Sequence, residues 1–161
     1  MSYPSGSVAN YFLAKGLEEG IKISPLKLQK LVYYAHGWQL ATVNEPLIDE
    51  PIYAWPYGPV IPSLYYEFRE FGNEPITEVA SEIDDANGVL VPYVIPKNSR
   101  DLGVLQSVWD GYKGFSAVQL SNMTHREGSP WAKVRSGTKL SDARPPIPNE
   151  LIRECFLQNN G

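Results

Sequence analysis

Cysteine is scarce in this chain, because Cys155 is the only one among its 161 residues. A single cysteine cannot form an internal disulfide, and such usage fits the reducing cytosol best. The length suits one domain over residues 1–161, since domains commonly run to about 100–200 residues. A chain of this size buries about two-thirds of its unfolded surface. We therefore expect a packed core that needs neither a disulfide nor a metal.

Long apolar runs and a targeting leader are also absent. No stretch approaches the roughly 20 apolar residues that a membrane helix needs. Residues 1–10 lack the basic region followed by an apolar run that marks a signal peptide. We expect a soluble, cytoplasmic protein.

The chain has no excess of positive charge. Its formal net charge is −4 and its pI is about 5.2. Proteins that bind nucleic acid generally are usually basic, since phosphate contacts supply most of their affinity. The balance argues against that class, and a mildly acidic surface suits either solubility or a basic protein partner.

The motifs of metal and phosphate chemistry are missing as well. The available ligands are His36, His125, Cys155 and scattered carboxylates, and none of them has zinc-ligand spacing. Neither C-x-x-C nor H-E-x-x-H occurs, and no glycine-rich phosphate loop is present. We expect no metal site and no cofactor.

Catalytic residues are equally hard to find. His125 and Glu127 could support acid–base chemistry in a small enzyme, but residues two apart on a helix do not face each other. His125 also lies where a helix is predicted to end, so it can satisfy free carbonyls there. Cys155 falls on the apolar face of the last predicted helix, where cysteine is inert. The sequence favours a binding module over an enzyme.

Helical periodicity and capping signals are abundant. They predict an α+β fold: a compact, mainly α-helical domain with a small β-hairpin or short antiparallel sheet. The helices are expected at residues 7–19, 25–42, 62–71, 99–112, 116–125, from about 131, and 149–158. Extended segments are expected at 47–55 and 144–148, and the strong turn at 84–88 predicts a hairpin or flap within 74–96.

The segment 23–38 is the most informative. Ser24 and Pro25 form a helix start signal. One face then carries apolar residues at helical spacing, namely Leu28, Leu31, Val32, Ala35 and Trp38. The opposite face carries Tyr33, Tyr34 and His36 where charged residues are usual. We expect that face to meet either the rest of the domain or a partner.

Three blocks of sequence stand out along the chain. Residues 26–38 read LKLQKLVYYAHGW, and residues 52–65 read IYAWPYGPVIPSLY. Residues 120–125 read LSNMTH and are followed by Gly128, Pro130 and Trp131. Together the three blocks resemble the Panacea domain, the antitoxin family that includes SocA-like and phage-associated GepA-like proteins. They stand in the family's order and span nearly the whole chain.

The resemblance implies a bacterial or prophage antitoxin that binds and neutralises a protein toxin encoded by a neighbouring gene. SocA-type members instead imply a proteolytic adaptor that delivers its toxin to the ClpXP protease. Some relatives carry an added DNA-binding domain. Because this sequence begins close to the first family helix, we expect it to lack one. The family supplies no catalytic set to carry over.

Aromatic residues of the three blocks are the natural anchors for a protein partner, because a few Tyr and Trp side chains often dominate an interface. The partner-binding candidates are Tyr33, Tyr34, His36, Trp55, Tyr57, Tyr65, His125 and Trp131. A structural role for His125 and Trp131, locking the third block onto the core, is the alternative. A loose basic cluster, either a solvated face or a patch for acidic partners, contains Arg126, Lys133, Arg135, Lys139 and Arg144.

Overall fold

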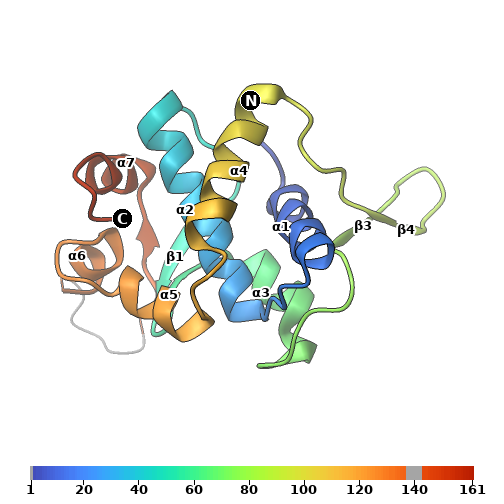
Figure 1. Ribbon diagram of the computed structural model, residues 1–161, viewed down its shortest axis with the longest axis horizontal. Coiled ribbons are helices and arrows are strands. Elements are labelled where there is room, and N and C mark those ends of the chain that lie inside the picture. The colour runs from blue at the N-terminus through green and yellow to red at the C-terminus, as the bar shows by residue number, and fades with distance from the viewer. Residues whose placement is uncertain (1, 137–142) are drawn as a thin grey trace.

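The computed structural model describes residues 2–136 and 143–161, so the predicted cluster member Lys139 lies outside the described residues. The longest helix, α2 (Pro25–Val43), runs through the middle of the molecule, and the other elements pack around it (Figure 1). Ser24 caps it as predicted, since the Ser24 Oγ accepts a hydrogen bond from the Lys27 N–H at 3.3 Å.

The remaining helices form a shell around α2. α1 lies on one side, α4 crosses it, and α5, α6 and α7 gather at the end that includes the C-terminus (Figure 1). Their bounds are α1 (Ser5–Glu19), α3 (Pro62–Phe68), the 3₁₀ turn η1 (Arg69–Phe71), α4 (Ser99–Tyr112), α5 (Ala117–Thr124), α6 (Pro130–Ser136) and α7 (Asn149–Leu157).

Two small antiparallel sheets complete the fold. The first has the order β2-β1-β5, with β1 (Ile52–Trp55) between β2 (Gly58–Val60) and β5 (Pro146–Ile147). The second is a hairpin of β3 (Ser81–Ile83) and β4 (Leu90–Pro92), at the opposite end of the molecule from α6 and α7 (Figure 1). The predicted α+β class, mainly helical with short antiparallel sheets, is confirmed.

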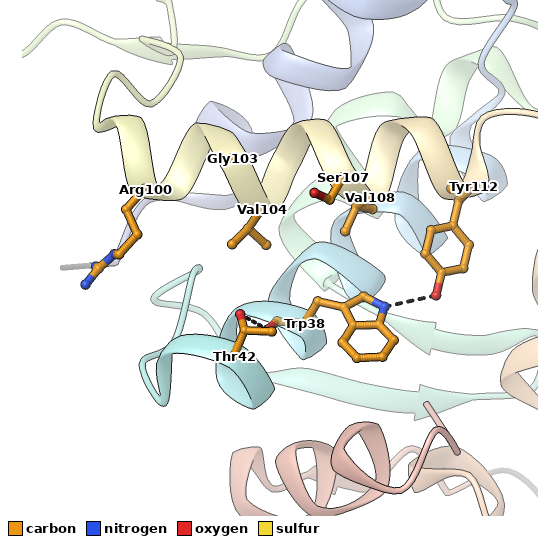
Figure 2. Close-up of a pocket in the computed structure, with 9 residues that line it drawn as sticks. Trp38, Thr42, Arg100, Gly103, Val104, Ser107, Val108 and Tyr112 are labelled. Atoms are coloured by element: carbon orange, nitrogen blue, oxygen red, sulfur yellow. Dashed lines mark hydrogen bonds between the residues drawn. The ribbon is translucent and has the colours of Figure 1, made fainter.

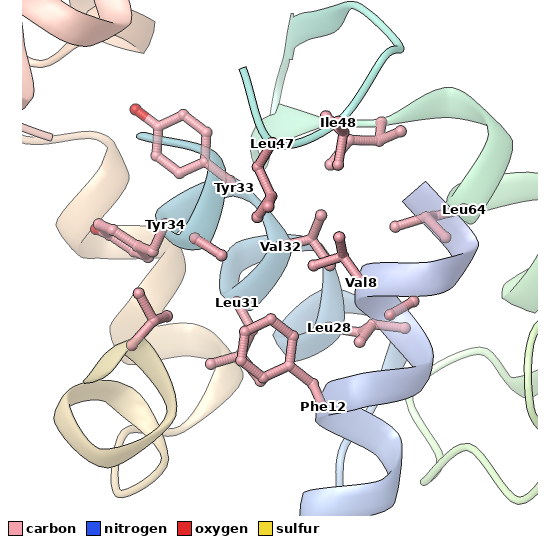
Figure 3. Close-up of a cluster of buried hydrophobic side chains, with 14 of the residues drawn as sticks. Val8, Phe12, Leu28, Leu31, Val32, Tyr33, Tyr34, Leu47, Ile48 and Leu64 are labelled. Atoms are coloured by element: carbon pink, nitrogen blue, oxygen red, sulfur yellow. The ribbon is translucent and has the colours of Figure 1, made fainter. Parts of the chain in front are cut away.

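The core lies where α1 meets α2. Val8 and Phe12 of α1 face Leu28, Leu31 and Val32 of α2 (Figure 3). Helix α2 is buried on its other sides too, because α4, α5 and α7 pack against it. A helix that is apolar or clamped all round belongs inside a domain rather than at its surface.

The extended segments differ from the prediction in extent. Only Ile52–Trp55 of the expected 47–55 strand is paired in the sheet, with a single bridge at Ile48, because Pro46 and Pro51 interrupt this stretch. The hairpin expected within 74–96 is confirmed as β3 and β4. The 144–148 segment supplies β5, which pairs with β1 although it lies about 90 residues further along the chain.

Candidate partner-binding site

Three of the predicted partner residues lie inside the protein. The exposed fractions of Tyr33 and His36 are 0%, and that of Tyr34 is 2%. Phe156 of α7 packs edge-on against both tyrosine rings, and Tyr112 of α4 stacks on Tyr34 with ring centroids 4.3 Å apart. Of the two alternatives predicted for this face of α2, the rest of the domain is the one that covers it, so the choice of these three residues as partner-binding candidates is wrong.

The polar residues of α2 hold the chain segments around them. The Gln29 amide donates to the Ile61 carbonyl at 3.0 Å and accepts from the Ile61 N–H at 2.8 Å. The Nδ1 atom of His36 accepts from the N–H groups of Leu47 and Ile48 at 3.3 Å. Its Nε2–H therefore donates to the Asn149 side chain, 2.8 Å away. These contacts satisfy buried backbone groups that would otherwise cost stability.

Lys30 contacts the β1–β2 hairpin from the interior of the protein. It is fully buried, and its Nζ donates to the Pro59 carbonyl at 3.1 Å. Burial lowers the pKa of Lys30 to about 7. Gly58 lies directly against it with φ of +116°, and a Cβ there would come within 2.7 Å of Thr124 Oγ1 and 2.9 Å of Lys30 Cε. Only glycine fits this turn.

Next to that hairpin lies a group of aromatic side chains and one arginine that we call the aromatic surface. It consists of Trp55 at the end of β1, Tyr57 in the turn, Tyr65 and Tyr66 on α3, and Arg144 just before β5. Tyr57 is 74% exposed, Tyr66 58% and Tyr65 44%. The Trp55 ring is half-buried between Tyr65, with centroids 5.0 Å apart, and the guanidinium of Arg144, 4.1 Å from the centroid. Aromatic rings and a guanidinium cation thus pack against one another at the protein surface.

His125 and Trp131 lie behind this surface and brace it. Their rings stack 3.8 Å apart with an interplanar angle of 10°. The Trp131 Nε1–H donates to the Trp55 carbonyl at 2.6 Å, and the Ser121 hydroxyl donates to the Tyr57 carbonyl at 2.7 Å. Helices α5 and α6 therefore hold the hairpin in place. Of the eight predicted residues, Trp55, Tyr57, Tyr65, His125 and Trp131 come together here.

The surroundings of His125 suit packing rather than proton transfer. Burial, followed by the charge of Lys30, lowers the pKa of His125 below its usual value. One face of its ring is covered by Trp131, and Glu127 is exposed. Among residues 2–136 and 143–161, no three His, Cys, Asp or Glu side chains gather closely enough to hold a metal ion.

A concave region of about 670 Å³ runs along α4. Figure 2 shows Val104, Val108 and Tyr112 of α4 facing Trp38 and Thr42 of α2 across it. The Trp38 Nε1–H donates to the Tyr112 hydroxyl at 3.0 Å and closes one end (Figure 2). This region is shallow and largely apolar, and we call it the α4 groove.

Comparison with known proteins decides the family. The family described as "Antitoxin SocA-like, Panacea domain" matches residues 28–132. The chain belongs to this family. It is also 34% identical to "Antitoxin SocA" of Caulobacter vibrioides (strain NA1000 / CB15N) over 137 residues, which are 84% of this chain and 72% of that protein. No solved structure matches the chain.

Membership in the SocA-like Panacea family supports an antitoxin function in general and implies a toxin partner in general. None of the helices in the described parts of the chain is long and apolar enough to cross a membrane.

The resemblance drawn from the three sequence blocks is confirmed, and the structure assigns their residues different tasks. The 26–38 block anchors neighbouring segments, the 52–65 block forms the exposed hairpin and the start of α3, and the third block braces it.

Sequence reasoning missed Tyr66 and the position of Arg144. Tyr66 stands beside Tyr65 in a run of exposed residues on α3, which is a usable signal. The stacking of Arg144 on Trp55 depends on the pairing of β5 with β1, which no local pattern indicates.

Proposed function

We propose that this chain neutralises a protein toxin, encoded by a neighbouring gene, by forming a direct complex through the aromatic surface. The observation that carries the proposal is the cluster of exposed Tyr57, Tyr65 and Tyr66 around Trp55 and Arg144. Tyr, Trp and Arg dominate the binding energy of protein interfaces. Family membership supports the antitoxin role.

The rigidity of this surface supports the proposal further. Hydrogen bonds from Trp131 and Ser121 fix the hairpin carbonyls, and Lys30 fixes Pro59 from within. A surface that is already ordered loses little conformational entropy on binding. The proposed role is therefore binding rather than catalysis.

Co-expression with the neighbouring gene tests the proposal. The chain should rescue growth from that gene's product and co-purify with it. Calorimetry should then show that Tyr57→Ala and Tyr65→Ala each weaken the complex by about tenfold or more. Because both side chains lie at the surface, Tyr57 74% exposed and Tyr65 44%, circular dichroism should show unchanged folding.

The matched control is Ser107→Arg, which places a long side chain at an exposed position of the α4 groove. It should leave the affinity for the toxin unchanged. Weaker binding by Ser107→Arg, with normal binding by Tyr57→Ala and Tyr65→Ala, would mean that the toxin binds the α4 groove.

Toxin half-life in protease-deficient cells separates sequestration from delivery to a protease. A toxin that is stable in complex supports sequestration, and one that persists only without the protease supports an adaptor.

A further inference from the structure

The β3–β4 hairpin has one face docked on the protein and one face exposed. Pairing places Ile83 opposite Leu90, and a hydrogen bond from the Tyr93 N–H to the Ala80 carbonyl, 3.0 Å, extends the same register. Because side chains alternate between the faces of a strand, Ala80 and Tyr93 share the face opposite to Ile83 and Leu90.

The inner face is held firmly against α1. Ala80 is 1% exposed, and the Asn10 side chain binds its N–H at 2.7 Å and its carbonyl at 2.9 Å. Asn10 also donates to the Tyr93 carbonyl at 3.0 Å, and the Tyr93 ring fills the space that a side chain at Gly6 would need. The hairpin is therefore a fixed part of the domain.

The outer hairpin face, which we define by Val79, Ile83, Leu90 and Val94, also carries Ser81 and Pro92 between them. Its four large apolar side chains are open to water: Leu90 is 72% exposed, Ile83 65%, Val94 64% and Val79 48%. The solvent face of an antiparallel sheet is normally polar. Exposed apolar residues gathered on one face mark an interaction surface.

The segment that carries this face is negatively charged. Residues 73–96 contain five carboxylates and no Lys, Arg or His, and the five are Glu74, Glu78, Glu82, Asp84 and Asp85. A local charge of −5 exceeds the −4 of the whole chain. Such a field repels nucleic-acid phosphates, anionic lipids and a second copy of the same face, and it attracts a basic chain.

The edges of the hairpin favour docking on the face over extension of the sheet. Pro92 has no N–H to offer a further strand on the β4 edge. On the β3 edge the Ser81 N–H already donates to the Glu67 carboxylate at 3.0 Å. Blunted edges of this kind protect a sheet from edge-to-edge pairing.

We infer that the outer hairpin face docks a basic polypeptide segment with alternating apolar side chains. The apolar side chains of the docked segment cover Ile83 and Leu90, and its lysines or arginines pair with the carboxylates within residues 73–96. This site is separate from the aromatic surface, and the inference stands whether or not the toxin binds there.

Nuclear magnetic resonance titration of the isotope-labelled chain tests the inference. The probe is a synthetic peptide of alternating Lys and Val, compared with Glu–Val and Lys–Ser peptides of equal length. The Lys–Val peptide should shift amide signals of residues 79–94, and its affinity should fall at high salt because screening weakens charge pairing. The other two peptides should bind at least about tenfold more weakly, because Glu–Val lacks positive charge and Lys–Ser lacks apolar side chains.

The double variant Ile83→Ser/Leu90→Ser should weaken Lys–Val binding by about tenfold or more while its other amide signals stay in place. The matched control is Val118→Ser, since Val118 is 64% exposed on α5, and it should bind normally. Equal binding of Lys–Ser, signal shifts confined to other regions, or no shifts at millimolar peptide would overturn the inference. The inference would also be overturned if the chain forms a dimer that Ile83→Ser/Leu90→Ser converts to monomers, because the outer hairpin face would then bind a second copy of the chain.

Discussion

At the scale of single residues, buried polar side chains in this protein hold distant backbone segments in place through hydrogen bonds. Gln29 and Asn10 each pair with both the N–H and the carbonyl of a distant residue. His36 uses both ring nitrogens, and Lys30 contributes a buried cation to the hairpin turn. Each side chain supplies a hydrogen bond to a buried backbone group that water does not reach. Residues of the family blocks that look chemically reactive are thus used for positioning.

Replacing Gly58 should show how tightly this turn is built. Gly58→Ala puts a Cβ at a positive φ and against Thr124 and Lys30, so we expect a loss of about 2–5 kcal/mol in the free energy of unfolding. Urea unfolding measures this. Gly20→Ala is the control, because Gly20 lies in the left-handed helical region with φ of +71° and open space around it, and the substitution should cost only about 1 kcal/mol. Equal losses would show that the contacts of Gly58 do not matter.

The buried amine of Lys30 predicts a dependence of stability on pH. Its folded pKa, about 7, lies below the unfolded value, so the unfolded state binds more protons between these two values. Stability should therefore rise with pH across this window, because the penalty for burying the charge disappears as Lys30 deprotonates. The contribution between pH 7 and pH 9 should be about 2 kcal/mol.

The Lys30→Met variant isolates this contribution. Chemical unfolding at pH 7 and pH 9 should show that the wild-type chain gains stability and that Lys30→Met gains about 2 kcal/mol less. The pKa of Lys27 is also lowered by burial, but that residue is present in both proteins and its effect cancels. The same gain in both proteins would contradict the assignment.

At the scale of elements, two hairpins are held in different ways. The β1–β2 hairpin is braced by α5 and α6 through Ser121 and Trp131. The β3–β4 hairpin hangs on α1 through Asn10. A two-stranded hairpin is marginally stable by itself in water. Its attachment to a helix therefore decides whether it stays ordered.

Removal of Asn10 should loosen one hairpin only. Asn10→Ala leaves the Ala80 N–H and the Tyr93 carbonyl without the side chain that pairs with them, and each buried unpaired group costs about 1–3 kcal/mol. Hydrogen exchange should accelerate over residues 80–93 while α2 remains protected. Gln29→Ala is the reciprocal control, since it should loosen the segment around Ile61 and spare residues 80–93. Uniform acceleration in both variants would instead indicate global destabilisation.

At the scale of the whole molecule, local patterns predicted most of the elements and few of their contacts. The capping signal at Ser24 is confirmed, and Asn98 and Ser116 cap α4 and α5 in the same way, because caps depend on hydrogen bonds within a few residues. The wrong assignment of Tyr33, Tyr34 and His36 to a partner has a clear cause. Their cover comes from α4 and α7, and helix periodicity does not indicate which distant element packs on a face.

The candidate site was predictable in part for the same reason. Trp55, Tyr57 and Tyr65 lie within one contiguous sequence block, so they stay close in any fold of the hairpin. Arg144 joins them only through the long-range pairing of β5 with β1. The separation of an aromatic surface from an acidic, apolar hairpin face also appears only in three dimensions.

Hydrogen exchange of the purified complex shows whether the toxin binds the aromatic surface, as we propose. Exchange should slow over residues 53–66 and next to Arg144 when the toxin is bound, while residues 103–111 of the α4 groove exchange as in the free chain. Slowing confined to residues 103–111, with residues 53–66 unchanged, would mean that the toxin binds the α4 groove and not the aromatic surface.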